Sequence, residues 1–219
     1  FKRYAVEIDG DGRRDVVDSI PDVLASTANN LKMDGWESGA SWGYEVVLPP
    51  NFDYLLADRS RQMPLHQWQA LGVKRAIPHA NSRPRTAAAS EETARWSDRA
   101  ELLLPAGARG PAFLTLQNFR VIMKYNPAEA YALAIGHLAD RLAGGGPLVQ
   151  SWPREERALS MAERFEMQQL LARRGFDVGA LDGLLGPRTR VAIRNFQVAA
   201  GQIPDGFASS SLLDRLRSP

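Results

Sequence analysis

Residues 110–142, GPAFLTLQNFRVIMKYNPAEAYALAIGHLADRL, carry the pattern that decides the fold of this 219-residue chain. Apolar residues recur at helical spacing on both sides of a central proline, which predicts two helices, over 115–124 and 127–143. Pro127 is tolerated in the first turn of the second helix, and the run GGGP at 144–147 ends it. We therefore expect a mainly α chain organised around this pair of helices.

One further helix and a β-rich stretch precede the pair. Residues 19–34 have apolar side chains at helical spacing, with Ser19 as a capping residue and Gly35 as the stop. From 36 to about 110, glycines and prolines surround short apolar runs such as Tyr44–Leu48, which favours a small β-rich insert. The predicted fold class is thus mainly α, with an α+β first part.

The end of the chain forms a separate unit behind a linker at 149–158. Three helical patterns, over Met161–Arg174, Thr189–Ala200 and Ser209–Leu216, predict a small bundle in residues 159–219. We refer to residues 1–148 as the body and to residues 159–219 as the tail.

Composition excludes several classes of protein. Hydrophobic residues make up 44% and charged residues 24% of the chain, both ordinary values for a folded domain. The absence of cysteine excludes disulfides and thiolate metal sites, and no apolar run approaches the roughly 18 residues of a membrane helix. With 27 basic against 25 acidic residues, the chain lacks the positive excess typical of proteins that bind nucleic acid.

The tail sequence MQQLLARRGFDVGALDGLLGPRTRVAIRNFQVAAGQIPDGFASSSLLDRL (167–216) resembles the peptidoglycan-binding domain of bacterial wall enzymes. Its Asp-Gly pairs, at 182–183 and 205–206, suit tight turns that need a positive φ, and Phe196 suits a core position. We therefore interpret most of the shared residues as a signature of the fold. The resemblance implies a shallow groove for wall glycan or stem peptide, in a three-helix domain.

The body is similar to the C-terminal part of the catalytic domain of a lytic murein transglycosylase of the membrane-bound transglycosylase B type. This resemblance implies a lysozyme-like domain with a β-rich insert. It rests on four stretches: FKRYAVEIDGDGRRD (1–15), SIPDVLASTANNLKMDGW (19–36), GYEVVLP (43–49) and residues 110–142.

The resemblance implies cleavage of the β-1,4 bond between N-acetylmuramic acid and N-acetylglucosamine without water, which gives a 1,6-anhydro product. A single glutamic acid would protonate the leaving oxygen, and such an acid needs a raised pKa in a partly apolar pocket. No cofactor is required for this chemistry. The expected partner is the glycan strand of peptidoglycan, and the expected location is the periplasm.

The family's general acid is expected upstream of Phe1, because none of Glu37, Glu45 and Glu129 matches its position. We interpret these three glutamates as structural or exposed. The chain is thus predicted to be catalytically incomplete, with an N-terminal catalytic segment, and an outer-membrane anchor if there is one, preceding it. The alternative is a non-catalytic peptidoglycan-binding protein or fragment.

Five residues match the part of the family's cleft that this chain retains. Tyr125, Asn126 and Tyr131 correspond to a Tyr-Asn and Tyr cluster beside the catalytic acid, where a tyrosine can stack on a sugar face and bond its hydroxyls. Asn29 and Asn30 correspond to an Asn-Tyr pair, so an amide stands here where the family has an aromatic ring.

An acidic loop near the start, EIDGDGRRD, has oxygens at alternate positions, as in a calcium-binding EF-hand loop. Glu7, Asp9 and Asp11 are the candidate side-chain ligands and Arg13 the candidate carbonyl ligand. The resemblance implies Asp22 as the closing ligand. The alternative is a loop held by hydrogen bonds from Asp side chains to the backbone, without a metal.

Overall fold

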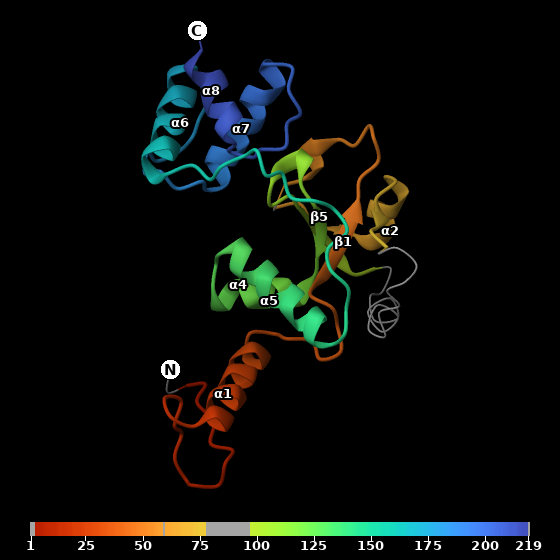
Figure 1. Cartoon of the computed structure of the whole chain (residues 1–219), viewed down its shortest axis with the longest axis vertical. Helices are drawn as coiled ribbons and strands as arrows, with labels where there is room; N and C mark the ends of the chain where they lie inside the picture. Colours follow the sequence, from red (N-terminus) through yellow and green to blue (C-terminus); the bar gives the residue numbers. More distant parts are fainter. Residues whose placement is uncertain (1–2, 59, 78–96, 219) are drawn as a thin grey trace.

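The computed structural model describes residues 3–58, 60–77 and 97–218, and Figure 1 shows their arrangement. The tail lies at one end, the sheet and two helices of the body lie in the middle, and helix α1 lies at the opposite end. The predicted β-rich insert falls partly outside the described residues, because it includes 78–96. None of the helices that the structure describes combines the length and the hydrophobicity that crossing a bilayer requires.

A five-stranded antiparallel sheet forms the centre of the body, in the order β2-β4-β5-β1-β3. Strand β5 is central and is buried along its whole length, so both faces of the sheet are covered. The strands are β1 (Gly43–Val47), β2 (Met63–Pro64), β3 (Lys74–Arg75), β4 (Arg99–Leu103) and β5 (Ala112–Thr115).

The two faces of the sheet bury different clusters. On one face, Leu102 and Leu114 pack with Trp68 of helix α2 (Leu65–Ala70), whose indole Nε1 donates to the carbonyl oxygen of Ala100 at 3.1 Å. The short 3₁₀ turns η1 (Tyr54–Leu56) and η2 (Gly107–Arg109) lie in the connections between strands.

On the other face, helices α4 (Gln117–Tyr125) and α5 (Glu129–Leu142) pack against Phe113 and Leu103, with Trp42 between them. Both helices were predicted, and α4 begins later than expected because the chain up to residue 115 still pairs in β5. Gly136 of α5 lies so close to Trp42 that an added Cβ would stand 2.5 Å from the indole ring.

Helix α1 (Ile20–Met33) begins and ends with the predicted cap and stop residues. Ser19 caps it by accepting from the amide of Asp22, and Gly35 ends it with a φ of +97°. Beyond the helix, the buried Asn118 holds the chain to α4: its side chain accepts from the Glu37 amide at 2.8 Å and donates to the carbonyl oxygens of Glu37 and Ala40.

The tail consists of helices α6 (Met161–Arg173), α7 (Pro187–Ala199) and α8 (Ser210–Arg217). These enclose a core of their own, in which Met167, Leu171, Ile193 and Leu213 are fully buried. All three helices were predicted from their apolar spacing. Helix α7 begins two residues earlier than expected, because Pro187 occupies its first turn.

We expect Gly136→Ala to lower the free energy of unfolding by about 1–3 kcal/mol, because the new methyl group would overpack Trp42. Helix propensity acts in the opposite direction by up to about 1 kcal/mol. Urea denaturation measures the balance. Ala134→Gly, at an exposed position of the same helix, is the matched control and should show only the propensity cost. A Gly136→Ala variant more stable than the parent chain would contradict this packing.

Candidate functional site

Tyr125 and Tyr131 stand together where α4 gives way to α5. Their rings stack with centroids 6.4 Å apart and planes 20° apart, and 52% of Tyr125 and 36% of Tyr131 are exposed. Asn126 is the C-cap of α4, and its Oδ1 accepts from the amide of Ala128 at 3.1 Å, which turns the chain into α5. The structure thus brings Tyr125 and Tyr131 together on one open, amphipathic surface of a kind that a sugar ring can stack on, and Asn126 follows Tyr125 in the turn.

Asn29 and Asn30 are half-buried on α1. The side chain of Asn29 donates to the carbonyl oxygen of Tyr4 at 3.0 Å, and the backbone oxygen of Asn30 accepts from the amide of Asp34. Among the described residues, no hydrogen bond ties either one to the tyrosine pair. Their part in binding stays a prediction.

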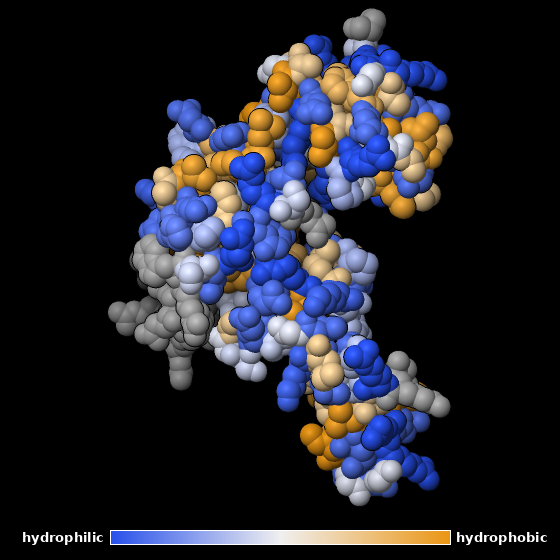
Figure 2. All heavy atoms as spheres, turned by 180° about the vertical axis from the view of Figure 1, so that it is seen from behind, coloured by the Kyte–Doolittle hydropathy of each residue, from blue (hydrophilic) through white to orange (hydrophobic). Residues whose placement is uncertain are grey.

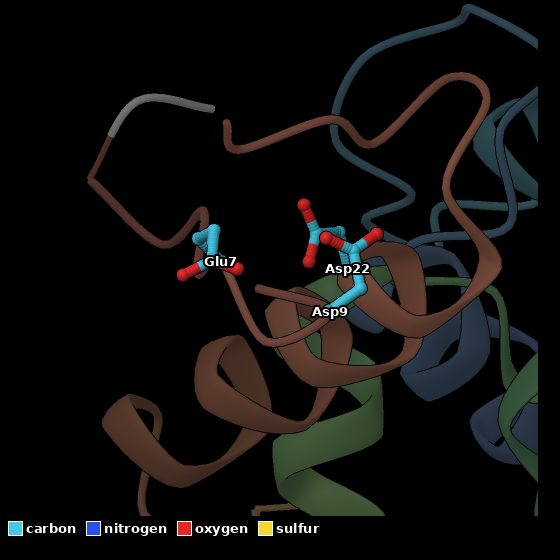
Figure 3. Close-up of side chains that lie close together, drawn as sticks. All are labelled: Glu7, Asp9 and Asp22. Atoms are coloured by element: carbon cyan, nitrogen blue, oxygen red, sulfur yellow. The ribbon is translucent and has the colours of Figure 1, made fainter. Parts of the chain in front are cut away.

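The acidic loop brings three of its candidate ligands together. Carboxylate oxygens of Glu7, Asp9 and Asp22 all lie within 4.8 Å of one another, and Figure 3 shows the three side chains around one space. Asp11 does not belong to this group within the described chain. Its Oδ1 instead accepts from the amide of Arg13 at 2.7 Å.

Hydrogen bonds also organise this loop. Asp22 is fully buried, and its two carboxylate oxygens accept from the amides of Ile8 and Asp15, each at 2.8 Å. Asp9 accepts from the hydroxyl of Ser19 at 2.5 Å. The donor set is of the hard oxygen type that calcium prefers, so these three residues fit a cation. The hydrogen bonds equally fit the alternative of a loop braced by its own backbone.

Two of the three glutamates considered as acids have structural partners. The carboxylate of Glu45 is buried and accepts from the amides of Val149 and Gln150, each at 2.7 Å, which ties the linker to strand β1. Glu129 pairs with Arg190 of the tail at 3.3 Å. These contacts fit the prediction of a structural role for the two residues, which stays a prediction.

In the tail, each Asp-Gly pair forms a turn held by a buried glutamine. Gln168 of α6 accepts from the amide of Gly183 at 2.8 Å. Gln197 of α7 accepts from the amide of Gly206 at 2.9 Å. Both glycines have positive φ, +72° and +71°, as predicted. No local pattern in the sequence marks Gln168, because its role depends on a contact 15 residues away.

The tail is docked on the body through Glu156, a linker residue. Its carboxylate accepts from the hydroxyls of Ser210 and Ser211, each at 2.8 Å, in the first turn of α8, and it pairs with Arg109 of η2. Burial alone would raise the pKa of Glu156. The hydrogen bonds from both serines and from Arg109 outweigh burial and lower the pKa to about 2.

Asp205 and Arg194 make two further contacts between tail and body. The Oδ2 atom of Asp205 accepts from the amide of Ala108 at 2.8 Å. Arg194 is only 9% exposed; it donates to the carbonyl oxygen of Ala57 and lies 3.5 Å from the carboxylate of Asp58. Charged side chains therefore fix the tail to the body at several points, in η2 and in the loop that follows η1.

A cleft of about 1350 Å³ lies between body and tail, and Figure 2 shows the molecule hollowed there. Helix α4 and the start of α5 form one wall, and α6 and α7 form the other. Its lining mixes apolar side chains with many charged ones. The charged lining residues are Asp58, Glu101, Arg120, Lys124, Glu129, Arg164, Asp177, Arg188, Arg190, Arg194 and Asp205.

Comparison with known protein families identifies two matching regions, which correspond to the body and the tail. The transglycosylase SLT domain family matches residues 1–140, and the peptidoglycan binding domain family matches residues 160–216. The chain therefore belongs to the transglycosylase SLT domain family and carries a peptidoglycan binding domain. Among curated protein sequences, none matches the chain.

Two solved structures of SltB3 from Pseudomonas aeruginosa are similar over 99% of this chain, each with a TM-score of 0.87. One, at 49% identity, is in complex with NAG-anhNAM-pentapeptide, and the other, at 48%, is in complex with NAG-NAM-pentapeptide. The soluble lytic transglycosylase SltB1 from Pseudomonas aeruginosa matches 65% of the chain at 25% identity, with a TM-score of 0.50. The chain spans about half of these relatives, 55% of SltB3 and 43% of SltB1.

Acid should loosen the docking of the tail through Glu156. Because its pKa falls from 4.5 to about 2 on folding, its contribution is complete above pH 4.5 and is lost as the pH falls towards 2. The shift corresponds to about 3 kcal/mol. Glu156→Gln should therefore lower the free energy of unfolding at pH 7, and its difference from the parent chain should shrink as the pH approaches 2.

Denaturation of both proteins at several pH values measures this difference. The neighbouring Glu155 is exposed, so Glu155→Gln is the control and should match the parent chain throughout. A Glu156→Gln deficit that stays constant down to pH 2 would rule out the ionic contact as its cause.

Proposed function

We propose that this chain is the wall-binding portion of a peptidoglycan lytic transglycosylase. The whole protein would cleave the β-1,4 bond between N-acetylmuramic acid and N-acetylglucosamine without water and leave a 1,6-anhydro end. Family membership supports this reaction class. So do the solved complexes of SltB3 with NAG-anhNAM-pentapeptide and with NAG-NAM-pentapeptide, which have the chemistry of a product and of an uncleaved unit.

The observation that carries the proposal for this chain is the stacked tyrosine pair. Tyr125 and Tyr131 present ring faces and hydroxyls from one surface, and Asn126 follows Tyr125 in the turn between the two helices. A sugar has apolar C–H faces and hydroxyl edges, so such a surface can bind both at once. We assign these three residues to substrate binding, with Asn29 and Asn30 as further candidates.

The general acid is assigned to none of the glutamates discussed above. Glu45 is held by two backbone amides and Glu129 by Arg190, so neither is placed to give a proton to a sugar. We expect the general acid to lie in the part of the related proteins' sequence that this chain does not span. The alternative function is peptidoglycan binding without catalysis, for which the same surface and the tail would suffice.

In this proposal the two units have different roles. Residues 1–148 would contribute the sugar-binding surface, residues 149–158 the linker and residues 159–219 a second contact with peptidoglycan. The reaction needs no cofactor. The substrate places the protein in the periplasm or at the cell wall, and attachment to the outer membrane through a segment preceding Phe1 stays a prediction.

A calcium ion, if bound, would have a structural role at Glu7, Asp9 and Asp22, where it would neutralise three carboxylates and hold the loop against α1. Arg13, through its carbonyl, and Asp11 remain predicted ligands. The loop lies beside α1, at the end of the molecule opposite the tail (Figure 1), so we assign such an ion to holding this part of the body together.

Binding to purified sacculi, followed by co-sedimentation, tests the function. We expect Tyr125→Ala and Tyr131→Ala each to weaken binding about threefold to tenfold, since each removes one face of the pair. Tyr125→Phe keeps the ring and should lose less. Leu142→Ala, at an exposed apolar residue of the same helix α5, is the control and should bind as the parent chain does.

The same incubation, analysed for 1,6-anhydro products by mass spectrometry, separates the two functions. We expect this chain to bind sacculi without releasing such products. Their release would show that the general acid lies within these 219 residues. Failure to bind at all would contradict both functions.

Calcium should raise the melting temperature of the parent chain, and EDTA should reverse the change, because a cation that binds only the folded loop stabilises it. Asp9→Asn removes one charge from the group of three and should abolish the response. Asp18→Asn, in the same loop but outside that group, should keep it. An unchanged melting temperature with millimolar calcium would favour the braced loop without metal.

A further inference from the structure

Trp42 lies where strand β5 meets the two helices that carry the tyrosine pair, and a carboxylate of α5 holds its ring. We propose that Asp140 is a positioning residue for the tyrosine pair. Through Trp42 it sets how α5 lies against α4, and therefore how Tyr131 stacks on Tyr125. The proposal rests on the proposed function, because that function gives the stacked pair its role in binding sugar.

Trp42 contacts both helices and the central strand. It is 6% exposed, and its ring centroid lies 6.0 Å from that of Phe119 on α4 and 6.2 Å from that of Phe113 on β5. On α5, an added Cβ at Gly136 would stand 2.5 Å from the indole ring. The carbonyl oxygen of Trp42 also accepts from the amide of Leu116, the N-cap of α4, at 2.8 Å. One residue therefore fixes the start of α4 through its backbone and the course of α5 through its side chain.

Asp140 fixes the orientation of that indole ring. Its Oδ2 atom accepts from Nε1 of Trp42 at 2.9 Å. An indole N–H can only donate, so without a partner it would be left unsatisfied among apolar side chains. Burial raises the pKa of the Asp140 carboxyl, and the hydrogen bond from Trp42, with His137 and Arg75 nearby, opposes the rise without cancelling it. An apolar residue would avoid this cost of burial, so the hydrogen bond to Trp42 accounts for a carboxylate at this position.

Two residues of α5 meet the Trp42 side chain, and they lie one helical turn apart. Gly136 and Asp140 share a face of the helix, so together they fix its rotation about its own axis as well as its distance from α4. At about 100° per residue, Tyr131 projects from the side of α5 opposite to Asp140. A rotation of α5 would therefore swing Tyr131 away from Tyr125, which belongs to the end of α4.

A purely structural contact would have a different signature from a positioning contact. It would lower the free energy of unfolding and leave binding unchanged wherever the chain stays folded. A positioning contact changes binding in the folded chain as well. Its effect on binding also requires Tyr131, because Asp140 would act through that ring.

Co-sedimentation of the 219-residue chain with sacculi tests the proposal, under conditions where circular dichroism shows each variant to be folded. Asp140→Ala should weaken binding about threefold, and by no more than Tyr131→Ala does. Asp140→Asn keeps an oxygen that accepts from Trp42 and should restore most of the binding. In the Tyr131→Ala background, Asp140→Ala should cause no further loss. Asp140→Leu, which packs on the ring without the hydrogen bond, is a second variant with the same expected loss of binding.

Two further variants are matched controls. Val73→Ala lies in the cluster on the other face of the sheet, so it should lower stability and bind as the parent chain does. Arg141→Gln removes an exposed charge next to Asp140 and should also bind as the parent chain does. Where Tyr131→Ala lowers binding, parent-like binding by both Asp140→Ala and Asp140→Leu would overturn the proposal. So would an equal loss for Val73→Ala, which would make binding follow stability alone.

A measurement without sugar separates this proposal from the proposed function. In a fluorotyrosine-labelled chain, the ring current of Tyr125 shifts the fluorine NMR signal of Tyr131, and Tyr125→Ala identifies that shift. Asp140→Ala should move the signal towards its value in Tyr125→Ala, and Asp140→Asn should leave it in place. An unmoved signal in Asp140→Ala would overturn the positioning role and leave the function standing. If instead Tyr131→Ala binds sacculi as the parent chain does, the sugar-binding surface fails and the signal alone decides the positioning role.

Discussion

The burial of strand β5 on both sides is the constraint from which the arrangement of the body follows. Neighbouring residues of this strand point to opposite faces, so Leu114 enters the cluster with Trp68 while Phe113 enters the cluster with Trp42. A sheet buried on both faces needs a layer on each, and α4 and α5 supply one of them. Their junction then faces outward, which is where Tyr125 and Tyr131 stack.

A second constraint fixes the tail. Asp205 uses its Oδ1 to close a turn within the tail, accepting from Gln197 at 2.7 Å, and its Oδ2 to accept from Ala108 of the body. The same carboxylate therefore serves the internal fold of the tail and its position on the body. An added Cβ at Gly107, whose φ is +67°, would lie 2.5 Å from this carboxylate, so only glycine admits the approach.

The helices could be predicted because each carries its own signal. Apolar spacing, Ser19 and Gly35 marked α1, and the core spacing marked all three helices of the tail. Strands β2 and β3 have only two residues each, which is too short for alternation to be visible. Helix α4 was predicted to start early, because its sequence does not show where the pairing of β5 stops.

The candidate sites likewise differ in how much of each one a local sequence signal could predict. Tyr125 and Tyr131 were chosen by resemblance, since their spacing does not place them on one helical face. They meet because Asn126 turns the chain between two helices. The cleft had no signal in the sequence at all: Lys124 and Arg164 are 40 residues apart and look like ordinary surface cations. Within the described residues neither one has an ion pair, which becomes visible only when the ion pairs of the neighbouring residues are known.

The acidic loop shows why hydrogen bonds and a cation need not be alternatives. An ionised carboxylate offers about four lone-pair positions for hydrogen bonds or metal ligation. The hydrogen bonds that Asp22 accepts from two amides occupy only some of them. Those two amides fix the direction of the Asp22 oxygens, and the hydroxyl of Ser19 fixes the direction of one Asp9 oxygen. The backbone thus sets the positions of the ligand oxygens in advance. A cation placed among Glu7, Asp9 and Asp22 would relieve the repulsion between their charges without having to reorganise the loop.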